Sequence, residues 1–191
     1  MKASGILLIL IITLNIVCVY PYLHSVDDDS EYPNTDIMNE RDDNKKKAKT
    51  VKNVNGTGLE KCNLNGDLET GIYRDGYCET NATDGGVHTI CAKMNNKWLK
   101  FNKEHGNDLT PPQHPTVGGF PGLIAGNYWC VCAIRWRNAI QAGHVAEVYL
   151  PATNKAVLGT IYKDDDVAKQ NLFKSCDKES RVGGVCPSYS G

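Results

Sequence analysis

Eight cysteines are spread along a chain that begins with a long apolar run, and together these two features constrain the fold more than any other. The apolar run follows Lys2 and extends over residues 5–20. A basic start before an apolar stretch is typical of a secretory signal, and this stretch is shorter than the ~20 residues of a membrane span. We therefore predict that residues 1–25 are a signal peptide. Residues 21–24 lack the small-x-small cleavage pattern, so an uncleaved signal anchor is the alternative.

The cysteines are predicted to form disulfides, because either kind of leader sends the rest of the chain into the oxidising secretory pathway, to be secreted or kept in an endomembrane lumen. Removal of the leader takes Cys18 away and leaves seven cysteines. We expect Cys176 and Cys186, which have two glycines between them, to pair and close the tail. Two bridges among the other five would leave one free thiol, and the sequence leaves their pairing open. These five are Cys62, Cys78, Cys91, Cys130 and Cys132.

The distribution of charge divides the chain further. Residues 26–52 carry an acidic block followed by lysines, with few hydrophobic side chains, which is typical of a disordered and solvated stalk. We predict a globular domain over residues 53–172 and a disulfide-closed tail over residues 173–191. From residue 53 onward acidic and basic side chains balance, which excludes a nucleic-acid partner. No second apolar run follows the leader, so we expect no membrane contact unless the leader is retained as an anchor.

Short hydrophobic segments and frequent glycines predict an α+β fold, a single compact domain that is rich in loops and has short strands and two main helices. The main helices are expected over residues 95–105 and 133–142, and a glycine suited to a helix C-cap follows each of them. Strands are expected at residues 87–94, 128–132 and 145–150, and two shorter helices at 155–158 and 164–172.

The strand predicted over residues 87–94 alternates between two faces. His88, Ile90, Ala92 and Met94 form the more apolar face, so we expect that face to be buried and His88 to lie at the edge of the core. Residues 106–126 form a long connection rich in glycine and proline, and a connection of this length in a small domain is often functional.

Five blocks follow one another along the chain, namely Thr70–Cys78, His88–Ala92, Gly106–Thr110, Phe120–Leu123 and Trp129–Trp136. In this order they resemble the family known as domain of unknown function 2237, which consists mostly of small bacterial proteins. The resemblance covers roughly residues 53–165 and implies a single compact domain, while it implies almost nothing about function. The chain departs from the family pattern at Tyr77, where the family tends to carry the first of two adjacent cysteines. A metal or redox site built on that pair would be incomplete here.

The segment Cys130-Val131-Cys132 is the most informative candidate for chemistry. Residues two apart in a strand point to one face, so both sulfur atoms can meet a common partner. If Cys132 instead begins the following helix, the helix N-terminus and Arg135 would stabilise its thiolate and make it reactive. The alternative is that both cysteines are buried small side chains or form bridges to Cys78 and Cys91.

A metal site and a catalytic site are the other hypotheses. Cys78, Cys91, Cys130 and Cys132, with His88 near them in sequence, offer ligands suited to zinc, although the Cys-x-Cys spacing is not that of the usual zinc knuckle. The sequence therefore predicts no cofactor, with zinc as the alternative. Candidate catalytic residues are Cys132, Cys130, Arg135 and His88, where His88 would act as a base within hydrogen-bond reach of the thiol.

Two triplets in predicted loops, at Asn55 and Asn81, have the form of N-glycosylation acceptors and agree with a secreted glycoprotein. No motif of a known hydrolase, phosphate-binding loop or dinucleotide site is present. We expect a disulfide-stapled, non-catalytic binding domain that recognises an unidentified ligand or protein through residues 106–126. The alternative is a thiol-redox or metal-binding protein, or a hydrolase, centred on Cys130 and Cys132, so the sequence leaves open whether the chain is an enzyme.

Overall fold

The computed structural model describes residues 51–64, 66, 68–112, 120 and 122–190. The predicted signal peptide and almost all of the predicted stalk therefore lie outside the described residues. The elements in chain order are β1 (Ile90–Lys93), α2 (Asn96–Glu104), β2 (Tyr128–Val131), α3 (Ala133–Gln141), β3 (Glu147–Val148), the 3-10 helix η2 (Leu150–Ala152), α4 (Ala156–Gly159), α5 (Asp166–Lys174) and the 3-10 helix η3 (Lys178–Ser180).

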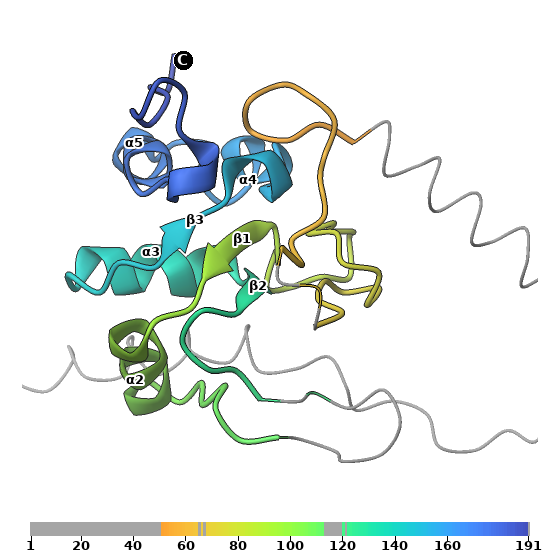
Figure 1. Cartoon of the computed structure of the whole chain (residues 1–191), viewed down its shortest axis with the longest axis vertical. Helices are drawn as coiled ribbons and strands as arrows, with labels where there is room; N and C mark the ends of the chain where they lie inside the picture. Colours follow the sequence, from red (N-terminus) through yellow and green to blue (C-terminus); the bar gives the residue numbers. More distant parts are fainter. Residues whose placement is uncertain (1–50, 65, 67, 113–119, 121, 191) are drawn as a thin grey trace, which may run out of the picture.

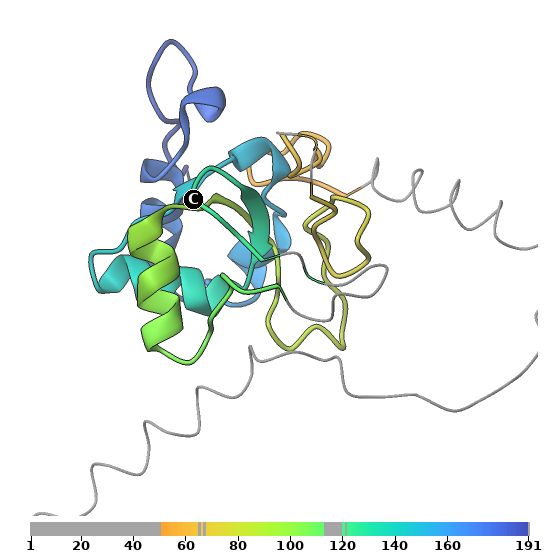
Figure 2. The same ribbon diagram turned by 60° about the horizontal axis from the view of Figure 1, so that its bottom comes forward.

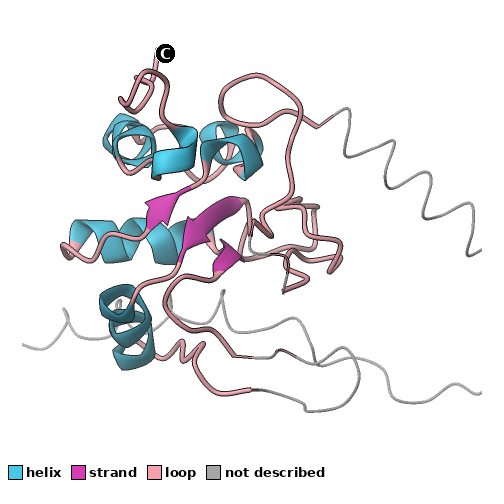
Figure 3. Ribbon diagram, in the orientation of Figure 1, coloured by secondary structure: helices cyan, strands magenta, loops and turns pink. Residues whose placement is uncertain are grey.

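A small antiparallel sheet lies at the centre of the fold, with strand order β2-β1-β3 (Figures 1 and 3). Helices surround the sheet on several sides, and the described residues that precede β1 form loops and turns (Figure 3). The predicted α+β class with short strands and abundant loops is confirmed. The strands are shorter than predicted, and the third one is reduced to β3 because the chain turns into η2 at Leu150-Pro151, where proline has no N–H to donate to a sheet.

The face of Ile90, Ala92 and Met94 is buried as predicted, but the other face of β1 is buried too, so the strand is not half-buried. Ile90 and Ala92 lie opposite Val131 and Trp129 of β2 and belong to the main core. Cys91 lies on the other face, opposite Cys130, and belongs to a second and smaller core. A central strand that is covered on both sides has no clear polar face. The alternation of side chains therefore identified one buried face and missed the other.

The helices α2 and α3 are confirmed where the sequence predicts them. The side chain of Asn95 caps α2 by accepting a hydrogen bond of 2.9 Å from the backbone N–H of Trp98, and Gly106 follows the helix at a φ of 76°. Buried side chains of α3 include Trp136, whose indole N–H donates to the Ala146 carbonyl at 3.1 Å. These contacts place α3 against the face of the sheet that carries Ile90.

A third helix of nine residues, α5, lies where the shorter helix over residues 164–172 is predicted, and it is as long as α2 and α3. The side chain of Asp165 caps α5 by accepting from the Ala168 N–H at 2.8 Å. Beyond α5 the tail pairs with the sheet, since Cys176 forms a parallel bridge with Val148. The tail then projects from the body of the domain (Figure 2).

No helix within the described ranges combines the length and the apolar character needed to cross a membrane.

Candidate functional site

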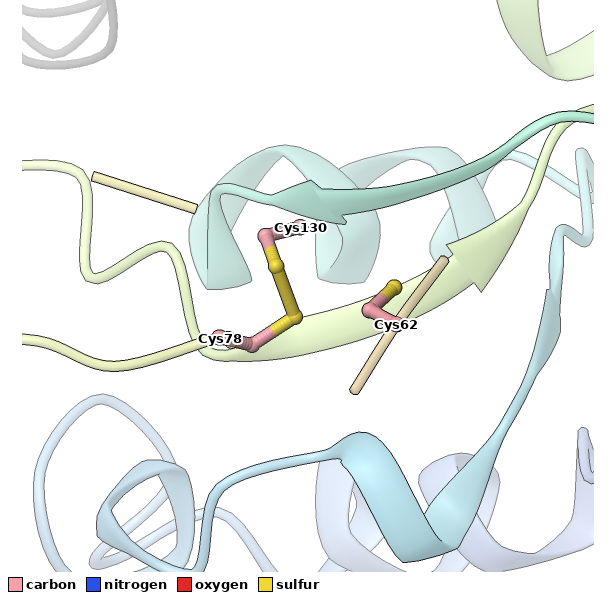
Figure 4. A group of neighbouring side chains, drawn as sticks. All are labelled: Cys62, Cys78 and Cys130. Atoms are coloured by element: carbon pink, nitrogen blue, oxygen red, sulfur yellow. A yellow bond between two sulfur atoms is a disulfide. The ribbon is translucent and has the colours of Figure 1, made fainter. Parts of the chain in front are cut away.

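Four cysteines gather on the face of the sheet opposite α3, and we call Cys62, Cys78, Cys91 and Cys130 the sulfur cluster. They form two disulfides, Cys62–Cys91 and Cys78–Cys130, with Cα–Cα distances of 5.5 and 5.2 Å. The Sγ atoms of Cys62, Cys78 and Cys130 all lie within 4.8 Å of one another (Figure 4). All four side chains are almost completely buried.

The register of the sheet explains how the two disulfides come together. Cys91 of β1 lies directly opposite Cys130 of β2, so their side chains share one face. Neither backbone N–H bonds to the other strand at this pair, because that of Cys91 donates to the Thr153 hydroxyl at 3.2 Å and that of Cys130 to the Thr70 hydroxyl at 2.8 Å. Each strand cysteine bonds to a loop cysteine, so the disulfides attach two irregular segments to the sheet.

Two tyrosines and Ala152 complete the packing around the sulfur cluster. The hydroxyl of Tyr128 donates to Asp177 at 2.8 Å, and that of Tyr149 donates to Glu60 at 2.6 Å. Burial and these carboxylate partners raise the pKa of both tyrosines, so both hydroxyls stay protonated hydrogen-bond donors. The cluster is therefore a buried core in which the cysteines pack with two tyrosine side chains.

The structure brings together only part of the group predicted to ligate metal. Cys78, Cys91 and Cys130 belong to the sulfur cluster, while Cys132 is not a member and precedes α3 as its N-cap residue. Cys62 takes the fourth place, and the sequence analysis missed it because the Cys62–Cys91 bond spans 29 residues of loop without a spacing motif. Cys132 is also disulfide-bonded, so the expected free thiol is absent from the described residues.

Arg135 lies on α3 one turn after Cys132 and is buried. Its guanidinium donates to the carbonyl of His105 at 2.8 Å, which connects α3 to the C-terminal end of α2. Burial lowers the pKa of Arg135. This contact gives the side chain a role in packing the two helices together.

His88 is held by a buried carboxylate. Its Nδ1 lies 2.6 Å from Asp84, and the other oxygen of Asp84 accepts from the His88 backbone N–H at 2.8 Å and from the Thr80 hydroxyl at 3.0 Å. The intervening Val87 has a φ of 48°, an uncommon conformation for a β-branched residue. Burial raises the pKa of Asp84, but the hydrogen bonds and charge of His88 and the Thr80 hydroxyl lower it more, so the net pKa is below its ordinary value of 3.8.

We expect Asp84→Asn to lower the thermal midpoint at pH 7 by the equivalent of about 1–3 kcal/mol, because the buried contacts to His88 and Thr80 lose their charged acceptor. Since the folded pKa of Asp84 is depressed, this stability is present above pH 3.8 and is lost as the pH falls through the folded pKa. The difference in thermal midpoint between the unmodified chain and Asp84→Asn should therefore shrink from pH 7 to pH 2. Thermal unfolding followed by circular dichroism measures this difference. Asp108→Asn is the control, since its contacts are exposed and should matter little. A difference that stays constant with pH would contradict the assignment.

The remaining predicted site residues are the two glycosylation candidates and the two tail cysteines. Asn55 and Asn81 are both exposed. The Asn81 side chain accepts from the Thr83 hydroxyl at 2.7 Å and donates to the Tyr73 hydroxyl at 2.8 Å. Cys176 and Cys186 are bonded to each other with a Cα–Cα distance of 5.7 Å, which is the pair that the sequence predicts.

Comparison with known proteins identifies the family. No curated protein matches the chain. The model of a family described as an uncharacterized protein conserved in bacteria, DUF2237, matches residues 52–170. This range is more than half of the chain and contains all four cysteines of the sulfur cluster, whereas Cys176 and Cys186 lie beyond it. The chain therefore belongs to the DUF2237 family.

Proposed function

We propose that the chain is a non-catalytic binding domain of the secretory pathway whose surface loops are held in place by disulfides. The observation that carries this proposal is the oxidised sulfur cluster, in which two disulfides attach the loops before β1 to the sheet. Disulfides of this kind persist in oxidising compartments, which agrees with the apolar leader. Cys130 and Cys132, the candidate nucleophiles, are both disulfide-bonded, and this favours binding over thiol catalysis.

The described ends of the 106–126 connection supply the recognition surface. The backbone N–H of Leu123 donates to the carbonyl of Leu109 at 2.8 Å, so the two ends are joined at their base. Nearby, Asp108 accepts from the Thr110 hydroxyl at 2.7 Å and pairs with Lys103 at 2.9 Å. Hydrogen bonds from Lys103 and Thr110 lower the pKa of Asp108 to about 2, so the carboxylate stays charged.

Ile124 follows directly after this base and is 70% exposed. A large apolar side chain on a firmly held segment is a suitable anchor for a protein partner, because little conformational entropy is lost when it is buried. We expect it to lie at the centre of the contact, with the charged pair Lys103–Asp108 at the rim.

The proposal predicts that a photoreactive amino acid at position 124 crosslinks to a discrete partner in cells that make the full chain through the secretory pathway. A matched control places the same amino acid at Val167, which is 65% exposed. This residue belongs to α5, which lies at the end of the domain away from the connection between α2 and β2 in Figure 1. The readout is a crosslinked band that is present for position 124 and absent for position 167. The same bands at both positions, or none at either, would contradict a recognition surface at Ile124.

Two measurements on the recovered chain test the secretory assignment in the same experiment. Intact mass with and without an alkylating reagent should show that no cysteine of the sulfur cluster is modified before reduction. Treatment with an N-glycosidase should reduce the mass, and Asn55→Gln and Asn81→Gln should identify the modified sites. A chain recovered from the cytosol with alkylated cluster cysteines would overturn the secretory assignment.

A further inference from the structure

We propose that the sulfur cluster has a second state, in which its four cysteines are reduced and bind one Zn²⁺ ion. This inference goes beyond the binding role above, which concerns the oxidised chain. It begins from the placement of the sulfur atoms. Those of Cys62, Cys78 and Cys130 lie within 4.8 Å of one another (Figure 4). That of Cys91 is bonded to Cys62. Three sulfur atoms are thus gathered at one point of the fold, and the fourth is bonded to one of them.

The stereochemistry of zinc matches this placement. A tetrahedral zinc site with four thiolates has Zn–S distances of ~2.3 Å, which puts its sulfur atoms about 3.8 Å apart. The sulfur atom of Cys62 lies within 4.8 Å of those of Cys78 and Cys130, so it needs only a small shift, whereas the bonded sulfur atoms of Cys78 and Cys130 must move apart. Reduction of each disulfide releases its two sulfur atoms, which then separate by rotation of the side chains.

The fold divides the ligands into a fixed pair and an adjustable pair. Cys91 and Cys130 face each other on paired strands, so their positions are set by the sheet. Cys62 and Cys78 lie in loop segments outside the sheet and can follow a change in sulfur spacing. A site of this kind resembles structural zinc sites, where all four positions are filled by protein and none is left open for substrate.

The surroundings also suit a closed metal site. Tyr128, Tyr149 and Ala152 pack against the cysteines and exclude water, which strengthens the attraction between the ion and the thiolates. Four thiolates around Zn²⁺ leave a negative charge. The ammonium group of Lys93 lies 5.6 Å from the centre of the Tyr128 ring and offsets part of that charge.

Conversion between the two states requires a dithiol reductant. Each disulfide takes two electrons and two protons from one dithiol, which is itself oxidised to a disulfide, so two dithiols convert the cluster to four thiols. One Zn²⁺ ion then displaces four protons, one from each thiol, and forms four Zn–S bonds. Oxidation by a disulfide reverses the process and releases the ion.

The test uses the full chain made in a reducing cytosol with added zinc and purified with a phosphine reductant. We expect one zinc per chain by elemental analysis and native mass spectrometry. Treatment with oxidised glutathione should release the zinc as Cys62–Cys91 and Cys78–Cys130 form. Replacing zinc with Co²⁺ should give the strong thiolate-to-cobalt absorbance of a tetrahedral site. Reduced chain that binds no zinc, or a cobalt spectrum without thiolate ligation, would overturn the proposal.

Variants then identify the ligands. Cys62→Ser and Cys78→Ser should each weaken zinc binding by at least about 100-fold, because each removes one ligand. Cys132→Ser and Cys176→Ser are the matched controls and should keep one zinc per chain, since neither residue belongs to the sulfur cluster. Loss of zinc in Cys132→Ser with retention in Cys62→Ser would overturn the proposed ligand set. Failure here would leave the crosslinking at position 124 unaffected, since that experiment uses the oxidised chain.

Discussion

Replacement of Cys78 and Cys130 together by alanine is expected to lower the free energy of unfolding by about 4 kcal/mol. Without the bond, the unfolded chain regains the entropy of a loop that spans 52 residues, which the chain-entropy relation converts to this value. The pair is also buried in the smaller core, so loss of packing adds to the effect. Urea denaturation of the two proteins, followed by far-ultraviolet circular dichroism, measures the difference.

The tail disulfide provides the control for this prediction. Its loop spans only 10 residues, so replacing Cys176 and Cys186 by alanine should cost about 3 kcal/mol or less by the same relation. The two bridges of the sulfur cluster overlap along the chain, so the intact Cys62–Cys91 bond continues to restrict the unfolded state of the first variant. A larger loss from the tail pair than from the cluster pair would contradict this account of their stabilising effect.

The second large effect is expected for Trp136→Ala, which should lower the free energy of unfolding by about 3–5 kcal/mol. Trp136 is fully buried in the main core beneath the sheet, so its removal leaves a cavity that the neighbouring backbone cannot fill. The change also leaves the carbonyl of Ala146 without its indole donor. The same urea denaturation measures the effect.

A pair of phenylalanine variants separates the hydrogen bond from the packing. Trp136→Phe removes the indole N–H that donates to Ala146 and should cost about 1–2 kcal/mol more than Trp98→Phe. Trp98 is equally buried, but its indole N–H has no hydrogen-bond partner within the described part of the chain. Equal losses for the two variants would show that the bond to Ala146 contributes nothing to stability.

Local sequence signals predicted the helices well. Asn95 caps α2 and Gly106 ends it, as their residue types indicate. Cys132 was expected either to continue the strand or to begin the helix, and the helix α3 begins directly after it. Strand lengths were predicted less well, because a strand ends where its hydrogen-bonding neighbour ends. The pairing of β3 with β1 covers only the residues opposite Ala92 and Lys93.

The sequence by itself determined the family blocks, the α+β class, the main helices and the pairing of Cys176 with Cys186, because each depends on residues that lie close together in the chain. Only the tertiary structure decided which of the remaining cysteines meet. Cys91 and Cys130 face each other because β1 and β2 pair in one register, and a shift of one residue would move them to opposite faces. Cys62 joins them through a loop. Cys132 is not part of the cluster because β2 ends at Val131 and Cys132 is already the N-cap residue of α3. Strand register and the path of the loops therefore decide which cysteines make up the candidate site. The spacing of cysteines along the sequence does not encode either of them.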